Sequence, residues 1–194
     1  MVINIFGNTI IDNGNYGILL YFSHYNTISG NNLTANEFGI YLYGSTYNNI
    51  SSNFIINNNG VGLWFFGSSH NNMVRNNITD NQRSMCFEMQ AFNNTIYHNN
   101  IVNNALQVLT DADSVNMWNN GSEGNYWSSY NGTDYDGDGI GDTRYIIDYN
   151  NQDNYPLIPE FPSWTLMLVA LAFVAVAGAI YKKRLTQKPL IDSS

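Results

Sequence analysis

The chain has 194 residues, a hydrophobic content of 44% and a net charge of −8 at pH 7. This length provides enough material for one elongated domain with appendages. Four of the seven basic residues lie in the C-terminal tail (Lys182, Lys183, Arg184 and Lys188). The remainder has no basic stripe to neutralise phosphates, which excludes nucleic acid as a partner. Cys86 is the single cysteine, so no intrachain disulfide supports the fold.

Asparagine repeats at a fixed period through residues 8–104. Anchor asparagines are separated by 23, 22, 23 and 23 residues, and a second asparagine follows each anchor by five residues. Fixed periods of about 20 to 50 residues are typical of solenoids, propellers and other arrays. The first set is Asn8, Asn31, Asn53, Asn76 and Asn99, and the second set is Asn13, Asn36, Asn58, Asn81 and Asn104.

Two aliphatic columns accompany these asparagines, one three residues before each anchor and the other two residues after it. Elsewhere in the repeats, apolar residues alternate with others, as at Ile18, Leu20 and Phe22, which is the periodicity of a strand. The first column is Ile5, Ile28, Ile50, Met73 and Ile96, and the second is Ile10, Leu33, Ile55, Ile78 and Ile101.

Short strands joined by tight turns predict an all-β fold, a right-handed parallel β-helix with coils of 22–23 residues over residues 1–110. Its coils would stack about 4.8 Å apart. Asparagine suits the turns because its amide can bond to the equivalent asparagine in the next coil and because it tolerates left-handed backbone. A leucine-rich repeat has a similar length, but its Leu-x-x-Leu-x-Leu core is absent. Since Ile3 already lies inside a repeat, we expect further coils upstream, or a first coil that pairs with another chain.

The strand register predicts an aromatic stripe on the outer face of one sheet. If Ile18, Ile40 and Leu63 point into the core, their immediate neighbours point outward. An exposed apolar patch often marks an interaction surface, and flat rings suit the C–H faces of sugars. The alternative is a structural role, in which the rings stack on one another or lie under a loop. The stripe consists of Tyr21, Tyr41, Tyr43, Trp64 and Phe66.

Catalytic and transition-metal sites have less support in the coils. Glycosidases need two carboxylates about 5 to 9.5 Å apart, and the register places the acidic residues in different columns or several coils apart. A metal site requires three or four donors that converge on one ion. His24 and His70 fall near the same turn but two coils apart, and His98 lies in another column. We therefore favour a domain without catalysis. The acidic residues are Asp12, Glu37, Asp80 and Glu88, and the histidines are His24, His70 and His98.

After residue 104 the repeat decays, and an acidic loop follows at residues 134–142. Its pattern, D-x-D-x-D-G-x-G-D, resembles the first part of an EF-hand loop. Hard oxygen donors at this spacing fold around Ca²⁺. Tyr145 stands where the EF-hand has a bidentate glutamate, so Asp148 or an asparagine would have to complete the set. The predicted ligands of a structural calcium ion are Asp134, Asp136, Asp138, Asp142 and the carbonyl oxygen of Ile140.

The recurring text N-x-I-x-x-N-x-I-x-x-N resembles the parallel β-helix repeats of the NosD-like group, a solenoid of the carbohydrate-binding and sugar-hydrolase type. The run that ends at Leu157 resembles the usual ending of such proteins, so residues 111–157 are predicted to form a C-terminal cap. This resemblance implies the fold and leaves the activity open. Lyases, hydrolases, epimerases, adhesins and a copper-maturation accessory protein share such solenoids.

A linker at residues 158–163 leads into an uncharged run at residues 164–181. At about 1.5 Å per residue this run approaches the thickness of a bilayer core, about 30 Å. Trp164 and Tyr181 flank it, and the basic tail at residues 182–194 indicates a cytoplasmic C-terminus. We therefore predict a single transmembrane helix with the coils outside the cell. The Pro-Glu-Phe linker, apolar run and basic cluster resemble the archaeal PEF-CTERM sorting signal, which implies processing by an archaeosortase. The ten-residue tail after Arg184 is longer than in such signals, so a retained anchor is the alternative.

These features together predict a cell-surface-anchored extracellular β-helix that binds polysaccharide or surface glycan, or serves as an envelope structural or adhesion module. The alternatives are a carbohydrate-active lyase, hydrolase or epimerase with its active coils upstream, and an accessory protein for copper-enzyme maturation. An extracellular location would also permit N-glycosylation. The sequons are at Asn32, Asn49, Asn77, Asn93, Asn120 and Asn131.

Overall fold

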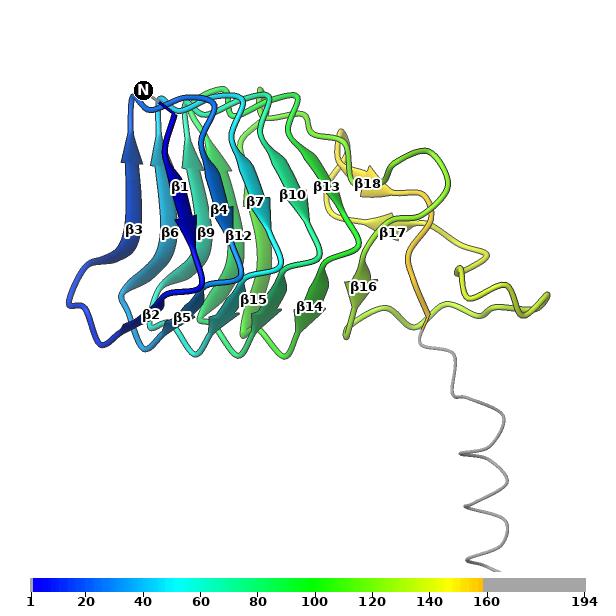
Figure 1. Cartoon of the computed structure of the whole chain (residues 1–194). Helices are drawn as coiled ribbons and strands as arrows, with labels where there is room; N and C mark the ends of the chain where they lie inside the picture. Colours follow the sequence, from blue (N-terminus) through cyan, green and yellow to red (C-terminus); the bar gives the residue numbers. More distant parts are fainter. Residues whose placement is uncertain (1, 159–194) are drawn as a thin grey trace, which may run out of the picture. The chain divides into compact units, whose positions relative to one another are not determined.

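The computed structural model describes residues 2–158, which form a parallel β-solenoid (Figure 1). The chain passes in turn through three sheets, here called sheets A, B and C, and each circuit makes one coil. The predicted all-β, parallel β-helix is therefore confirmed. In this part of the chain, no helix is long and apolar enough to cross a membrane. The transmembrane helix at residues 164–181 and the tail at 182–194 lie outside the described residues and stay predictions.

Within each of these sheets, every strand pairs in parallel with the equivalent strand one coil on. Sheet A contains β1 (Asn4–Phe6), β4 (Thr27–Ser29), β7 (Asn49–Ser51), β10 (Asn72–Val74) and β13 (Thr95–Tyr97). Sheet B contains β2 (Thr9–Ile11), β5 (Asn32–Thr34), β8 (Phe54–Ile56), β11 (Asn77–Thr79), β14 (Asn100–Val102) and β16 (Tyr126–Trp127). Sheet C contains β3 (Tyr16–Tyr21), β6 (Phe38–Tyr43), β9 (Val61–Phe66), β12 (Arg83–Glu88) and β15 (Leu106–Thr110). A separate antiparallel pair consists of β17 (Tyr145–Ile146) and β18 (Gln152–Asp153).

The register of the strands confirms the aliphatic columns. In sheet A, Ile28 pairs with Ile50 one coil later, and both side chains are fully buried. In sheet B, the buried Leu33 pairs in the same way with Ile55. Like residues thus stack on like residues along the inside of the solenoid. Because burial of apolar surface contributes about 25 cal/mol per Å², these stacks supply the core of the fold.

Three ladders of buried asparagines run along the turns of the solenoid. Asn76 illustrates the pattern, because its Oδ1 accepts the backbone N–H of Asn53 at 3.0 Å and the side-chain N–H of Asn53 at 2.9 Å. Its own Nδ2 donates to the carbonyl oxygen of Ile50 at 2.8 Å and to Oδ1 of Asn99 at 2.9 Å. Both predicted ladders are confirmed. The sequence analysis missed the third ladder, which consists of Asn26, Asn48, Asn71, Asn94 and Asn116.

The turns are left-handed at the residue before each ladder asparagine except Asn116. We expected the asparagine itself to adopt this backbone, and that explanation is wrong. Ser52 has φ 55° and Arg75 has φ 57°, and each precedes a ladder residue, Asn53 or Asn76. Left-handed backbone costs an L-residue about 1 kcal/mol or more. The hydrogen bonds of the ladder offset that cost, so asparagine is present for its amide and not for its backbone preference.

Irregular chain continues the solenoid beyond β15. Trp118 and Trp127 are buried against the last coil, with the Trp118 ring edge-on to Phe87 at a centroid distance of 5.6 Å. The indole N–H of Trp118 donates to Oδ1 of Asn151 at 3.1 Å. The same oxygen accepts the backbone N–H of Asn116 at 2.9 Å, so Asn151 ends the third ladder.

Asp153 ends the ladder that starts at Asn8. Its Oδ2 accepts the backbone N–H of Asn125 at 2.7 Å and the indole N–H of Trp127 at 3.0 Å, and the residue is fully buried. A Cβ at position 124 would lie 1.8 Å from Oδ1 of Asp153, so Gly124 is required for this close approach. Burial raises the pKa of Asp153 above its ordinary value of 3.8, although the hydrogen bonds from Trp127 and Asn125 act in the opposite direction.

This raised pKa predicts a specific pH dependence for the variant Asp153→Asn. A carboxyl with a raised pKa in the folded state stabilises the fold below its unfolded pKa and loses that contribution as pH rises through the folded pKa. Asparagine keeps an acceptor oxygen and does not titrate. The free energy of unfolding of the variant should therefore increase relative to the native protein as pH rises from about 4 toward neutrality, as measured by urea unfolding. A difference that stays constant with pH would contradict the prediction.

Candidate functional site

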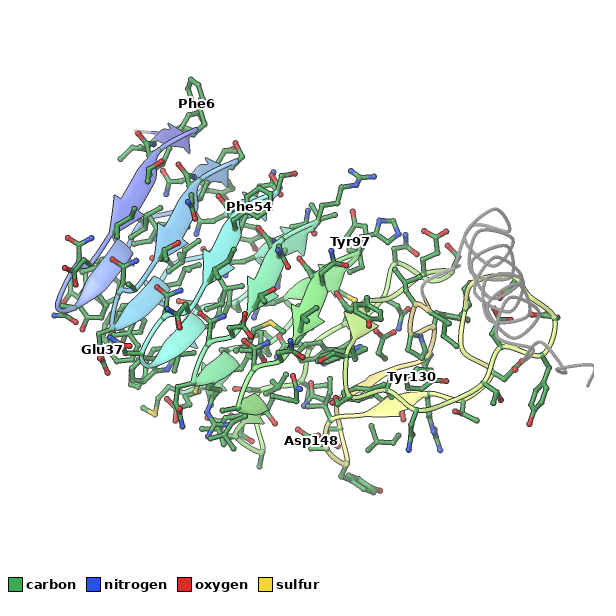
Figure 2. All side chains as sticks on the ribbon, turned by 90° about the horizontal axis from the view of Figure 1, so that it is seen from below. Phe6, Glu37, Phe54, Tyr97, Tyr130 and Asp148 are labelled. Atoms are coloured by element: carbon green, nitrogen blue, oxygen red, sulfur yellow. The ribbon has the colours of Figure 1, made fainter. Side chains whose placement is uncertain are left out.

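The outer face of sheet C carries a row of stacked aromatic rings. Tyr21, Tyr43 and Phe66 come from successive strands and lie in register. The Tyr21 and Tyr43 rings stack with centroids 5.1 Å apart, as do the Tyr43 and Phe66 rings, with interplanar angles of 20° and 11°. Rings stacked at coil spacing cover one another's faces, so the row presents ring edges and phenol hydroxyls outward. Equivalent side chains align in such columns along the coils (Figure 2).

Tyr41 and Trp64 form a second row beside the first, with centroids 4.9 Å apart. Tyr41 points away from the core, as predicted, but it is only 9% exposed. Tyr16 stacks on it at 5.0 Å and Phe38 packs alongside at 6.5 Å. Burial is the main reason that the pKa of Tyr41 is raised. Tyr16 and Phe38 therefore belong to the aromatic face, although the sequence analysis did not single them out. Their 22-residue spacing at paired strand positions was the available signal.

A polar group lies at the edge of the aromatic face. The indole N–H of Trp64 donates to Oε2 of Glu88, on the next coil, at 2.9 Å. This bond fixes the Trp64 ring and leaves the second carboxylate oxygen of Glu88 for other partners. Cys86 follows Trp64 in the second row, one coil on, but it is buried and burial raises the pKa of its thiol to about 12. It is therefore a packing residue and not a reactive thiolate.

The acidic loop brings three of its predicted ligands together. Carboxylate oxygens of Asp134, Asp136 and Asp138 lie within 4.8 Å of one another. Asp134 accepts backbone N–H groups from Gly137 at 2.7 Å and Gly139 at 2.9 Å. The bond from Gly139 is the main cause that lowers the pKa of Asp134, whereas the negative charge of Asp138 raises the pKa of Asp136. Three close carboxylates repel one another, and a bound cation would relieve that repulsion.

The remaining predicted ligands occupy different places. Oδ2 of Asp142 accepts the backbone N–H of Tyr135 at 2.8 Å, so this carboxylate closes the loop on itself. Ile140 lies two residues after Asp138 and donates its backbone N–H to Oδ1 of Asp138 at 2.8 Å. Asp148, which is labelled in Figure 2, was considered for the last ligand position. It instead bonds to Thr110 and the Asn151 amide. It does not join the cluster.

Two contacts hold the acidic loop against the rest of the domain. The N–H of Gly141 donates to the carbonyl oxygen of Pro156 at 2.8 Å, and the N–H of Ile158 donates to that of Gly139 at 2.9 Å. Gly137 and Gly139 have φ values of 76° and 83°, where glycine avoids the strain that a side chain would cause. The set of hard oxygen donors and its glycine turn fit Ca²⁺.

The histidines remain apart, as the sequence indicated. His24 bonds to Thr46 at 2.8 Å, His70 stacks on Tyr47, and His98 bonds to Glu123. Across residues 2–158, the three aspartates of the acidic loop are the sole group of three or more His, Cys, Asp or Glu side chains that could share an ion.

The fold defines the class as a parallel β-solenoid of stacked coils. A model of the NosD family, described as periplasmic copper-binding protein, matches residues 2–132, which is more than half of the chain. The chain belongs to the NosD family. Its periplasmic description is consistent with coils outside the cytoplasm. None of the curated proteins matches the chain.

The residues of the described domain do not fit the copper in this family description. Copper prefers imidazole, thiolate and thioether donors. Here the imidazoles are separated and the one thiol is buried and protonated. The cluster that does form has carboxylates alone, which suit calcium better than copper.

Proposed function

We propose that this chain is an extracellular β-helix module that binds polysaccharide across the aromatic face of sheet C. The observation that carries the proposal is the periodic row of ring edges and hydroxyls, with Trp64 held by Glu88 beside it. A periodic, hydroxyl-rich polymer can repeat the same contacts at each coil, so weak contacts add together along its length. The ring edges of the row are the apolar groups available for such contacts.

A structural role in the cell envelope is the second candidate. It is favoured by the stacking of the rings on one another, which uses their faces inside the protein. An accessory role in copper-enzyme maturation is a third, and membership of the NosD family favours it. We place that role in contacts with a partner, because the His and Cys side chains of residues 2–158 form no group of three that could hold an ion.

The full-length chain incubated with a panel of insoluble polysaccharides tests the binding role. We expect depletion of the chain by one intact polysaccharide, and binding about tenfold weaker in Trp64→Ala, because large aromatic residues dominate such contacts. Tyr47→Ala is the matched control, since Tyr47 stacks on Tyr25 at 5.1 Å on a turn away from sheet C.

Three other outcomes would contradict polysaccharide binding on sheet C. Equal losses in Trp64→Ala and Tyr47→Ala would mean that the stacks contribute stability alone. Absence of depletion by every polysaccharide would favour the structural module. Release of oligosaccharides, detected by mass spectrometry of the supernatant, would indicate a carbohydrate-active enzyme.

We also propose that the acidic loop holds a structural Ca²⁺ ion through Asp134, Asp136, Asp138, Asp142 and the Ile140 carbonyl. A ligand that binds the folded state raises the melting temperature, and extracellular sites bind Ca²⁺ with dissociation constants of about 10⁻⁴ to 10⁻³ M. We expect millimolar Ca²⁺ to raise the melting temperature of the full chain, by calorimetry, and Asp136→Asn to abolish this response. Asp113→Asn, at an exposed aspartate outside the loop, should retain it. An undiminished response in Asp136→Asn would contradict the assignment.

A further inference from the structure

A pocket of about 530 Å³ lies beside β13, between the turn at residues 117–121 and the segment at residues 150–154. This volume falls in the range of about 300 to 1,000 Å³ typical of small-molecule sites. The pocket shares no lining residue with the aromatic face or the acidic loop. All of its lining residues are uncharged, in a chain whose net charge is −8.

One wall of the pocket comes from the segment that ends the asparagine ladders. Side chains alternate along extended chain, and here Asn151 and Asp153 point inward and are buried. The intervening Asn150, Gln152 and Asn154 line the pocket. Within the segment 150–154, the buried side chains complete the core of the domain and the alternate side chains line the pocket.

The side-chain amides of Asn150, Gln152 and Asn154 are not used by the fold. Within residues 2–158, none of them makes a hydrogen bond to another residue, whereas the amide of a ladder residue such as Asn76 is fully bonded. Each free amide offers two donors and an acceptor. The three side-chain amides of the segment 150–154 are therefore available to bind a ligand.

The opposite wall combines a fixed turn with an apolar side chain. Oδ1 of Asn120 accepts the backbone N–H groups of Ser122 at 3.0 Å and Glu123 at 2.9 Å, which holds the turn and leaves the Asn120 amide nitrogen unused. Gly121 permits the turn with φ 99°. Met117 lies next to it and is 52% exposed, so its flexible thioether offers an apolar surface.

We propose that this pocket binds a neutral saccharide unit. Carboxamides bond to the hydroxyls of a sugar both as donors and as acceptors, and Met117 suits the C–H face of the ring. The pocket contains no cation to hold a carboxylate or phosphate group, and no carboxylate to hold a metal ion. The inference shares a ligand class with the proposed function and does not rest on the aromatic face, because the two surfaces have no residue in common.

Methyl NMR of the full-length chain, with ¹³C-labelled methionine methyl groups, tests the pocket directly. The probes are neutral hexasaccharides of glucose, galactose, mannose and xylose, with a uronic-acid hexasaccharide as the charged comparison. We expect a saturable shift of the Met117 resonance with a neutral probe and none with the charged one. The resonance is assigned with Met117→Leu. Met89, exposed at the end of β12 and outside the pocket, is the internal reference and should not move.

The double variant Gln152→Ala/Asn154→Ala should bind the neutral probe about tenfold more weakly, because it loses two sets of hydrogen bonds. Gln82→Ala/Asn59→Ala removes the same two amides from exposed positions on the coils and should bind as the native chain does. A Met117 resonance that stays unshifted with every neutral probe would overturn the pocket, even if Trp64→Ala weakened polysaccharide binding. A Met117 shift that survives Trp64→Ala would support the pocket when the aromatic face fails.

Discussion

The solenoid depends on one repeated interaction, the hydrogen bonding of a buried asparagine amide to its equivalent one coil away. A buried carboxamide without partners is costly, because each unsatisfied group loses about 1 to 3 kcal/mol. Asn76 meets this requirement through Asn53 and Ile50 on the preceding coil and Asn99 on the following coil. All hydrogen-bonding groups of the amide find partners only when the equivalent turns of neighbouring coils lie directly above one another. The ladders therefore fix the register, and the aliphatic columns then meet in the core.

The same requirement explains how the domain is built beyond the last coil. The ladder that starts at Asn8 needs a final acceptor, and the chain supplies the buried carboxylate of Asp153. The third ladder needs another, and Asn151 supplies it two residues earlier. Because these two side chains point inward, Gln152 between them and Asn150 and Asn154 on either side line the pocket. Ladder termination and pocket formation thus follow from one strand of alternating side chains.

The sequence predicts the parts of the structure that repeat. The spacing of Asn8, Asn31 and their equivalents predicts the coil length, the strand register and two of the ladders. The third ladder, which includes Asn26 and Asn48, has the same period but lies in another turn of the coil. The prediction started from the column of Asn8 and therefore did not include it. The local spacing of the aspartates in the acidic loop also predicts that their carboxylates lie close together. The structure brings three of them within 4.8 Å of one another.

The parts that were missed depend on contacts between distant residues without periodicity. Whether Tyr41 is exposed depends on Tyr16 and Phe38, which cover it from the starts of two strands. Asp153 accepts a hydrogen bond from the backbone N–H of Asn125, which lies 28 residues earlier in the chain. No repeat connects these two positions. Surface function is hard to predict for the same reason. A periodic face is evident from the repeat, whereas its coverage by neighbouring side chains is not.

The free energy of unfolding of Asn76→Ala, compared with that of Asn59→Ala, tests the role of the ladders most directly. Asn76 is a buried ladder residue, whereas Asn59 is exposed in the turn between β8 and β9. Loss of the Asn76 amide leaves donors of Asn53 and the carbonyl of Ile50 unpaired, so we expect a loss of about 3 kcal/mol or more. Asn59→Ala should change stability by less than about 0.5 kcal/mol. Similar values for the two variants would contradict the account, because the ladder would then contribute no more than a surface residue.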